Sequence, residues 1–408
     1  MASKILIYVP NFGLESGGIK QYSSLLLRIL KKDTDNFYYI YHDKNDPEVI
    51  GPDVLSSNQR VVTISEMHQL LLKDKSFYFK RIINYLSRIF KLNSRLFIPD
   101  ALDNYCRKEN IDIIHCPYQF TPDIKNVKTI CTLHDVQELH FPEFFTPEER
   151  ANRAVNYLKF ATQASHIVVS YEHVKVDLEL FFKIDKRKIS TILLDMDYMW
   201  FQRFTDTTPI DVEYLQLPSR YLFYAANTWA HKNHLALIDV IARLKKEGLI
   251  VNLVCCGHQN ENMVNIRDTI DELDLNGQVK FLGLVSEEVL FSLYKNTAGV
   301  VIPTLYEAGS FPLIESIYLG IPVICSNVTS LPETIGDTRF MFDPTEINDI
   351  QEKVRLLWSD EAFALAAAAN ASNQKRKFDN LNSLNKIKKV YSMLSNNAYS
   401  FNNNDKLQ

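Results

Sequence analysis

No apolar stretch in the 408-residue sequence reaches the roughly 20 residues that a membrane-spanning helix needs. The first residues, "MASKILIYVPNF", form a short β-like run without the longer apolar core of a signal peptide. The net charge of −4 gives no overall attraction to nucleic acid. We therefore expect a cytoplasmic globular protein that has no nucleic acid partner.

The cysteines show no C-x-x-C spacing, and most of them lie in apolar runs such as "LVCCGH". This pattern predicts buried free thiols rather than disulfides or a zinc site. The residues concerned are Cys106, Cys116, Cys131, Cys255, Cys256 and Cys325. The sequence also contains neither the G-x-G-x-x-G loop of dinucleotide-binding domains nor the G-x-x-x-x-G-K-[ST] loop of nucleoside triphosphatases.

Short β-rich runs alternate with helical patterns along the whole chain. The runs are almost continuously apolar, which indicates strands buried on both faces of parallel sheets. The chain is also too long for one ordinary core. We therefore predict an α/β fold of two domains, with strands that begin near residues 4, 37, 60, 111, 128 and 166 in the first and near 221, 251, 279, 299 and 322 in the second.

A polar segment with two prolines, residues 203–220, has no clean period and predicts a linker between a domain over 1–202 and a domain over 221–377. Residues 378–395 carry apolar side chains on one face of a helix. The polar tail, 396–408, is predicted to be disordered.

The stretch "PTLYEAGSFPLIESIYLG" places Glu307 and Glu315 eight residues apart, across the predicted turn from a strand to a helix. Ser310 is a candidate helix N-cap, and Gly320 is a candidate stop. Free backbone N–H groups at a helix start can bind a phosphate, and ligands of open α/β sheets bind at the carboxyl ends of strands. The alternative is a pair of surface glutamates that flank a loop.

Three further clusters follow predicted strands. Lys232 in "YAANTWAHKNH" is placed to neutralise a diphosphate, or else it is a solvated lysine at a helix end. His134 in "TICTLHDVQELHF" is placed to act on a substrate, or else it is a structural histidine bonded to a loop carbonyl. Gly17 and Gly18 follow the first strand and open a helix, so that backbone can approach a ligand.

Together these clusters resemble the retaining nucleotide-sugar glycosyltransferases of glycosyltransferase family 4. The resemblance covers nearly the whole chain and is most specific in the second half. It implies a GT-B fold, in which two Rossmann-like domains with parallel sheets face a central cleft. The terminal helix over 378–395 is then expected to cross back to the first domain.

The resemblance also implies residue roles. Glu307 and Glu315 match the E-x7-E motif, with the first near the transferred sugar and the second on the ribose. Lys232 matches the lysine that holds the pyrophosphate, and His134 the histidine beside the reacting sugar. We therefore assign catalysis to His134, Lys232 and Glu307, and nucleotide-sugar binding to Gly17, Gly18, Asn227, Ser310, Phe311, Leu313 and Glu315.

The sequence departs from the family pattern at two places. Asn227 stands where an arginine is usual, five residues before Lys232, so Lys232 is expected to carry more of the phosphate neutralisation. Ala308, Gly309 and Ser310 replace the common Gly-Phe-Gly. Two D-x-D pairs, at residues 33–35 and 195–197, lie outside the context of the metal-binding D-x-D of the other large glycosyltransferase fold, and no metal is expected.

Residues 73–95 hold seven Lys or Arg and one acid, with apolar and basic side chains on opposite faces of a predicted helix. An anionic membrane surface is a candidate partner for this segment, at the inner face of the plasma membrane. The alternative is an ordinary core-packed helix with a solvated basic face.

The sequence thus predicts a transferase that moves a hexose-type sugar from a nucleotide-diphosphate sugar to a glycan or lipid-linked acceptor, with retention. The expected setting is the synthesis of a surface polysaccharide such as O-antigen or capsule. No cofactor is expected besides the nucleotide sugar itself. The alternatives are a GT-B nucleotide-sugar epimerase, a phosphorylase and a catalytically inactive partner subunit.

Overall fold

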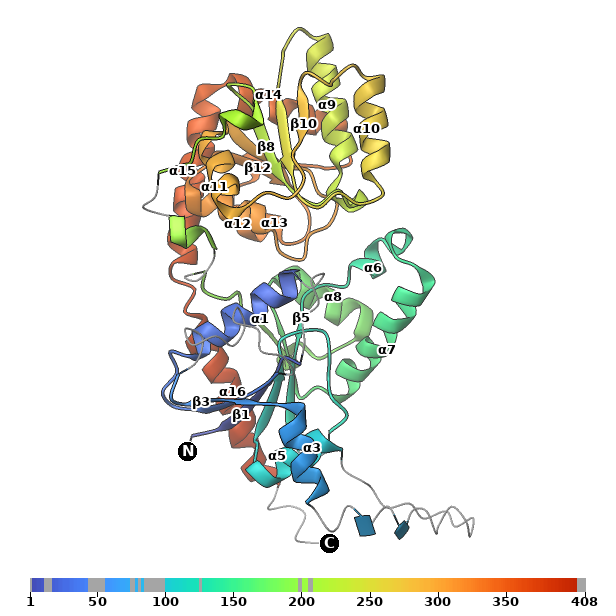
Figure 1. Ribbon diagram of the computed structural model, residues 1–408, viewed down its shortest axis with the longest axis vertical. Coiled ribbons are helices and arrows are strands. Elements are labelled where there is room, and N and C mark those ends of the chain that lie inside the picture. Colours follow the sequence, from blue (N-terminus) through green and yellow to red (C-terminus); the bar gives the residue numbers. More distant parts are fainter. Residues whose placement is uncertain are drawn as a thin grey trace.

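The computed structural model describes residues 2–10, 17–42, 56–73, 78–79, 82–83, 100–124, 127–196, 200–204 and 208–401. It consists of two α/β domains, drawn one above the other in Figure 1. The two-domain α/β prediction is confirmed.

In the described part of the chain, the first domain has a sheet of seven parallel strands in the order β3-β2-β1-β4-β5-β6-β7. This is the strand order of a Rossmann sheet with one further strand at its edge. The strands are β1 Lys4–Tyr8, β2 Phe37–Tyr41, β3 Gln59–Val62, β4 Ile113–Cys116, β5 Lys128–Leu133, β6 His166–Val169 and β7 Ile189–Thr191.

The second domain has a six-stranded parallel sheet in the order β10-β9-β8-β11-β12-β13, as far as the chain is described. Its chain order is the same doubly wound pattern, so both domains are Rossmann-like. The strands are β8 Leu222–Ala225, β9 Leu253–Cys256, β10 Val279–Phe281, β11 Gly299–Ile302, β12 Val323–Ser326 and β13 Met341–Phe342.

Helices cover both sheets, as parallel strands require for their crossovers. Those of the first domain are α1 Gly17–Leu30, α3 Ile64–Leu72, α5 Ala101–Glu109, α6 Gln137–His140, α7 Pro147–Gln163 and α8 Glu172–Phe182. Those of the second are α9 His234–Lys246, α10 Met263–Glu272, α11 Glu287–Asn296, α12 Phe311–Leu319, α13 Leu331–Ile335, α14 Ile347–Ser359 and α15 Glu361–Phe378; α16 Ser383–Phe401 ends the described chain. Six short 3₁₀ turns in the described segments complete the elements: η1 Pro142–Phe144, η2 Lys186–Lys188, η3 Trp200–Phe204, η4 Glu213–Leu215, η5 Ala230–Lys232 and η6 Thr338–Phe340.

The domains meet where the strands of both sheets end. In Figure 1, α12 and α13 lie at the lower edge of the second domain, opposite α1 and α8 of the first. The loops after β5 and β6 contribute to the same region as the loop after β11. Parallel strands therefore deliver their carboxyl-end loops from both domains to one cleft.

The terminal helix was predicted over residues 378–395, and this prediction is wrong at both ends. Phe378 is the buried last residue of α15, and the chain then turns before α16 begins at Ser383. Asn382 takes the left-handed conformation (φ 55°), which breaks the helix. At the other end α16 continues to Phe401, into the segment predicted to be disordered. Residues 402–408 lie outside the described chain.

The crossing of α16 to the first domain is nevertheless observed. Its apolar face, from Ile387 to Leu394, packs into the same core as β1 and α1. Asp195 anchors its start, because the Ser383 hydroxyl donates to the Asp195 carboxylate at 2.7 Å. In Figure 1, α16 runs down from the second domain and along the first.

The expected linker, 203–220, lies between the two sheets in the chain. From residue 208 on it belongs to the second domain by its contacts: the Ile210 N–H donates to the Ser292 hydroxyl at 2.9 Å, and Leu217 packs on the second core.

The basic segment 73–95 lies largely outside the described residues, so its amphipathic helix stays a prediction. Among the described residues, no helix is both long and apolar enough to cross a membrane.

All six cysteines are buried and free, as predicted. Burial raises the pKa of their thiols; for Cys131 and Cys256 it lies at about 12. These thiols are therefore protonated and unreactive at neutral pH.

His115 of β4 joins α16 to the centre of the first sheet. Its ring nitrogens lie 2.7 Å from the Tyr391 hydroxyl and 3.2 Å from the Thr132 hydroxyl. Burial, helped by nearby His166, lowers the pKa of His115 from 6.5 to about 3. The ring is therefore neutral in the folded protein at any pH near neutrality.

This burial predicts an acid-sensitive stability. Because the folded pKa of His115 is below the unfolded value, its contribution is fully present above pH 6.5 and is lost as the pH falls toward 3. We expect H115Q to reduce the fall in unfolding free energy below pH 6.5 by about 1.4 kcal/mol per pH unit. Urea unfolding at pH 7.5, 6.0 and 5.0 measures it, with H68Q at exposed His68 as the control. Equal slopes for wild type and H115Q would contradict the assignment.

Candidate active site in the interdomain cleft

A cavity of about 260 Å³ lies between the two domains. From the first domain it is lined by Gly18 and Tyr22 of α1, by His134 and Asp135 after β5, and by Tyr171 after β6. From the second domain it is lined by Ala308, Gly309, Phe311 and Ile314. The glycine loop, the histidine and the E-x7-E segment, more than 100 residues apart in the sequence, therefore meet as predicted.

Lys232 and Glu307 form an ion pair beside this cavity. The Lys232 Nζ lies 2.5 Å from the Glu307 Oε2, and the two side chains are 19% and 8% exposed. Each charge is thus largely withdrawn from water and held by the other. The two residues predicted to act on the diphosphate and on the sugar are therefore each other's partner.

The loop that carries Lys232 is fixed from several sides. The Tyr224 hydroxyl donates to the Lys232 carbonyl at 3.0 Å, and the Leu305 N–H donates to the His231 carbonyl at 2.7 Å. Asn233 takes the left-handed conformation (φ 60°), and its side-chain amide donates to the carbonyls of Pro303 and Pro344, each at 3.0 Å. These bonds tie the loop after β8 to the loop after β11.

Ser310 is the N-cap of α12, with Pro312 in the first turn and Gly320 (φ 69°) at the end, as the sequence predicted. Its side chain does not cap the helix, however. The Ser310 hydroxyl is fully buried and has no hydrogen-bond partner among the described residues. A buried hydroxyl without a protein partner is unusual, so Ser310 is a candidate hydrogen-bond donor to a ligand at this helix start.

The first turn of α12 also offers backbone donors. The first N–H groups of a helix lack partners within the helix. The first turn of α12 has no acidic side chain that could accept hydrogen bonds from these N–H groups or repel an anionic ligand. Pro312 has no N–H, so Phe311 and Leu313 are the donors available there. Leu313 itself is completely buried in the second core, so only its backbone can contact a ligand.

His134 is neutral and carries its proton on Nε2. That atom lies 3.1 Å from the Pro117 carbonyl oxygen, which can only accept a hydrogen bond. Burial lowers the pKa of His134, against the opposing effects of this carbonyl and of Asp135. Nδ1 is then an acceptor. The ring bonds a loop carbonyl, as one interpretation of the sequence expected, and it also lines the cavity; its action on a substrate stays a prediction.

Glu315 is buried away from the cavity lining. The Tyr294 hydroxyl donates to its Oε2 at 2.6 Å, and the residue is 6% exposed. The Glu315 charge in turn raises the pKa of Cys256 beyond the effect of burial alone. The structure therefore places Glu315 one helical turn below the α12 start, with one carboxylate oxygen already engaged.

Asn227, in the position of the usual arginine, is exposed at the end of β8. Its side-chain oxygen accepts the His258 N–H at 2.8 Å, which fixes the loop after β9. Its contact with a donor phosphate stays a prediction. Gly17 is the first residue of α1, and Gly18 faces Phe311, because a Cβ there would lie 3.9 Å from the Phe311 ring.

Two chain segments that contribute to the site were missed by sequence reasoning: Tyr171 after β6, and the loop after β12 with Thr329 and Ser330. Tyr171 packs so closely on Gly309 that a Cβ at Gly309 would lie 2.9 Å from its ring, so a larger residue there would displace the ring. Thr329 and Ser330 bond the Glu307 backbone from the loop after β12. Both follow parallel strands, and that position was the signal available in the sequence.

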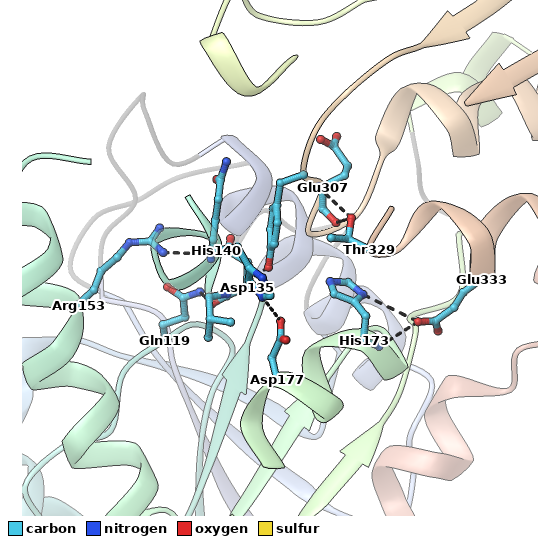
Figure 2. Close-up of polar contacts among 12 residues, drawn as sticks. Gln119, Asp135, His140, Arg153, His173, Asp177, Glu307, Thr329 and Glu333 are labelled. Atoms are coloured by element: carbon cyan, nitrogen blue, oxygen red, sulfur yellow. Dashed lines mark hydrogen bonds and ion pairs between the residues drawn. The ribbon is translucent and has the colours of Figure 1, made fainter. Parts of the chain in front are cut away.

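A polar cluster stands behind Asp135. Arg153 donates to Asp135 at 3.0 Å and to Glu138 at 2.5 Å, and His140 lies 2.9 Å from Asp177 (Figure 2). These contacts fix the loop after β5 on α7 and α8. The loop that presents His134 is therefore held rigidly.

The aspartates of the two D-x-D pairs serve the fold where they are described. Asp195 caps α16, and Asp33 accepts hydrogen bonds from Tyr38 (2.5 Å) and Asn36 (2.7 Å). Asp197 lies outside the described residues. Within the described ranges, no three His, Cys, Asp or Glu side chains are grouped so that they could hold a metal ion.

Comparison with known proteins agrees with this arrangement. Residues 211–378 match the family model described as glycosyl transferases group 1. The matched range contains Lys232, Glu307, Ser310 and Glu315. The second domain is thus the part of the chain that the family model describes.

Two curated relatives are mannosyltransferases of Escherichia coli. The chain is 24% identical to O-antigen chain mannosyltransferase B over 285 residues, 69% of this chain and 74% of the relative. It is 26% identical to the serotype-specific mannosyltransferase WbdA over 265 residues, 62% of this chain and 32% of that relative. The chain therefore spans about a third of WbdA.

A solved structure shows the same fold at low sequence identity. Anabaena Alr3699/HepE, in complex with UDP and glucose, superposes with a TM-score of 0.67 at 16% identity, over 96% of this chain and 100% of that one. Sucrose-phosphate synthase from Thermosynechococcus elongatus superposes with a TM-score of 0.64 at 16% identity, over 96% and 99% of the two chains. The match of residues 211–378 to the glycosyl transferases group 1 model, the mannosyltransferase relatives and the shared two-domain fold together support a GT-B glycosyltransferase.

Proposed function

We propose that this protein transfers a hexose-type sugar from a nucleotide-diphosphate sugar to a glycan or lipid-linked acceptor, with retention at the anomeric carbon. The observation that carries the proposal is the Lys232–Glu307 ion pair, set in the cleft near the uncapped start of α12. The ion pair and the start of α12 together offer one cation, one carboxylate and backbone N–H donors to the same ligand.

The donor diphosphate is proposed to bind at the start of α12. Its oxygens accept hydrogen bonds from the buried Ser310 hydroxyl and from the N–H groups of Phe311 and Leu313. The positive end of the helix dipole favours the negative phosphate. Asn227, at the end of the neighbouring β8, is proposed to donate its side-chain N–H groups to the same diphosphate.

Lys232 is proposed to change partner when the donor binds. In the structure its ammonium is neutralised by Glu307. A diphosphate brings more negative charge and attracts the ammonium more strongly. Glu307 is then released to accept hydrogen bonds from the sugar hydroxyls, while Glu315 is proposed to accept from the ribose.

The transfer step breaks the bond between the anomeric carbon and the phosphate oxygen, whose electron pair leaves with the nucleoside diphosphate. A new bond forms between that carbon and the acceptor oxygen, and the acceptor proton passes to the departing phosphate. Lys232 and the α12 dipole stabilise the charge on the leaving group. Attack from the face that the phosphate leaves gives retention. Neutral His134 orients the sugar from the first domain.

The acceptor is proposed to enter along the first-domain wall of the cavity, past Gly18 and Tyr22. The names of the relatives support a surface polysaccharide such as O-antigen as the product, and mannose as the first sugar to test. A lipid-linked acceptor would bring the enzyme to the cytoplasmic membrane face, where the basic segment 73–95 is the proposed contact.

The first prediction concerns turnover. We expect nucleoside diphosphate to be released from one donor in a panel of UDP-, GDP- and dTDP-sugars, and only when a membrane-lipid or glycan acceptor is present. K232A and E307A are each expected to lower the rate about a hundredfold, the scale of one lost transition-state contact. K295A, at an exposed lysine of α11, is the control. Release without acceptor would point to an epimerase or hydrolase, and full activity of both variants would contradict the site.

The second prediction concerns the ion pair before any donor binds. In K232M or E307Q the surviving group stays buried without its ion-pair partner, so the costs of the two single changes add up to more than the cost of the double change. We expect a double-mutant cycle in urea to give a coupling energy of about 2 kcal/mol. The exposed pair Lys375–Asp379, with side chains 40% and 42% exposed, is the control and should couple by less than about 1 kcal/mol. Absence of coupling between Lys232 and Glu307 would show that the pair does not form.

The third prediction separates ligand binding from folding at α12. S310A removes a buried hydroxyl that has no partner, so the unfolding free energy should stay the same or rise. Its affinity for the nucleoside diphosphate should fall about fivefold, the value of one hydrogen bond. S316A in the same helix is the matched control, because the Ser316 hydroxyl already donates to the Pro312 carbonyl at 2.7 Å. It should lose stability and keep its affinity; calorimetry that finds the reverse pattern would refute the assignment.

A further inference from the structure

The start of α8 in the first domain is capped by a carboxylate of the second domain. The Glu333 oxygens of α13 accept the backbone N–H groups of Glu172 and His173, each at 3.0 Å. The N-cap residue of α8, Tyr171, makes no side-chain capping bond of its own. Figure 2 shows Glu333 directed across the cleft toward His173. The N–H groups of Glu172 and His173, at the start of α8, are therefore satisfied through a contact between the domains.

Glu333 is ionised in this contact. Burial raises the pKa of Glu333, but the nearby His173 ring and the two backbone N–H groups outweigh it, so the pKa lies below its ordinary value. A charged acceptor at a helix N-terminus gains both from the hydrogen bonds and from the helix dipole. The contact thus stabilises the observed arrangement of the two domains, in which α13 meets α8.

The segment that carries Glu333 also holds Glu307. Four residues earlier, the Thr329 hydroxyl accepts the Glu307 N–H at 3.0 Å and donates to the Glu307 carbonyl at 2.9 Å. The Ser330 hydroxyl donates to the same carbonyl at 3.0 Å. Thr329 lies at φ 51°, a strained position for a β-branched residue, and its bonds to Glu307 maintain it there. Figure 2 shows Thr329 beside the Glu307 backbone.

Glu307 is tied to the first domain from its other side as well. The preceding residue, Tyr306, accepts the Val136 N–H at its hydroxyl (3.4 Å), and its ring lies 5.5 Å from that of His140. The residue before Glu307 and the α13 segment bonded to the Glu307 backbone therefore both contact the first domain. Opening the domains would release Tyr306 and Glu333 together.

We propose that Glu333 is a positioning residue that couples closure of the two domains to the placement of Glu307. Its contact with α8 holds the cleft closed, and the loop through Ser330 and Thr329 transmits that closure to the Glu307 backbone. The inference rests on the proposed function of the cleft, and it deepens that function by naming what aligns its carboxylate.

Three variants separate the steps. E333Q keeps the side chain but removes its charge, and we expect a larger radius of gyration without nucleotide and a transfer rate about tenfold lower. T329V keeps the shape and removes the hydroxyl, and we expect a similarly lower rate with an unchanged radius. E149Q is the matched control, since Glu149 caps α7 within the first domain by accepting the Thr146 N–H at 2.8 Å. It should lower the melting temperature and change neither the radius nor the rate.

Small-angle scattering and nucleoside diphosphate release are measured on the same preparations, with the melting temperature checked for each variant. An E333Q protein with the wild-type radius would overturn the closing role of Glu333. A larger radius with a wild-type rate would overturn its coupling to Glu307, as would full activity of T329V. If the wild type itself releases no nucleoside diphosphate with any donor and acceptor, the proposed function fails, and the inference that rests on it fails with it.

Discussion

The rest of the site depends on the ion pair between Lys232 and Glu307. Two opposite charges, mostly withdrawn from water, hold the loops after β8 and β11 at one point of the cleft. Neither charge is stable there alone. Each charge of the pair is neutralised by the other, and under the proposed function the donor diphosphate replaces Glu307 as the partner of the ammonium. The pair therefore stabilises this part of the cleft, and the proposal uses the same two charges to bind the diphosphate and the sugar.

The surrounding elements explain why this pair can work at the boundary of two domains. Parallel strands bring the loops after β5, β6, β11 and β12 to facing edges, and each of these loops makes a contact across the cleft. Close packing of Tyr171 on Gly309 leaves no space for a side chain at the glycine. The polar cluster of Asp135, Arg153 and Glu138 fixes the loop with His134. The second domain thus supplies the charges, and the first domain supplies the surface that orders them.

Much of the fold and part of the site could be predicted from the sequence. The buried strands were readable from their apolar runs, and the start and stop of α12 from Ser310 and Gly320, because these signals are local. The strands β7 and β13 are too short to show a pattern and lie at sheet edges. The break before α16 depends on the left-handed conformation of Asn382. The apolar pattern continues through residues 378–395, so it gives no sign of this break. The contacts of Glu333 with α8 depend on how the domains pack, and no local pattern records that.

The account can be tested most directly by determining the structure of the protein with its nucleotide-sugar donor bound and measuring the distances from the Lys232 Nζ. We predict that the ammonium lies within hydrogen-bond distance of a diphosphate oxygen, that Glu307 has moved to the sugar hydroxyls, and that the Ser310 hydroxyl contacts the phosphate. A bound donor that leaves the Lys232–Glu307 pair intact, with its diphosphate away from the start of α12, would contradict the central claim.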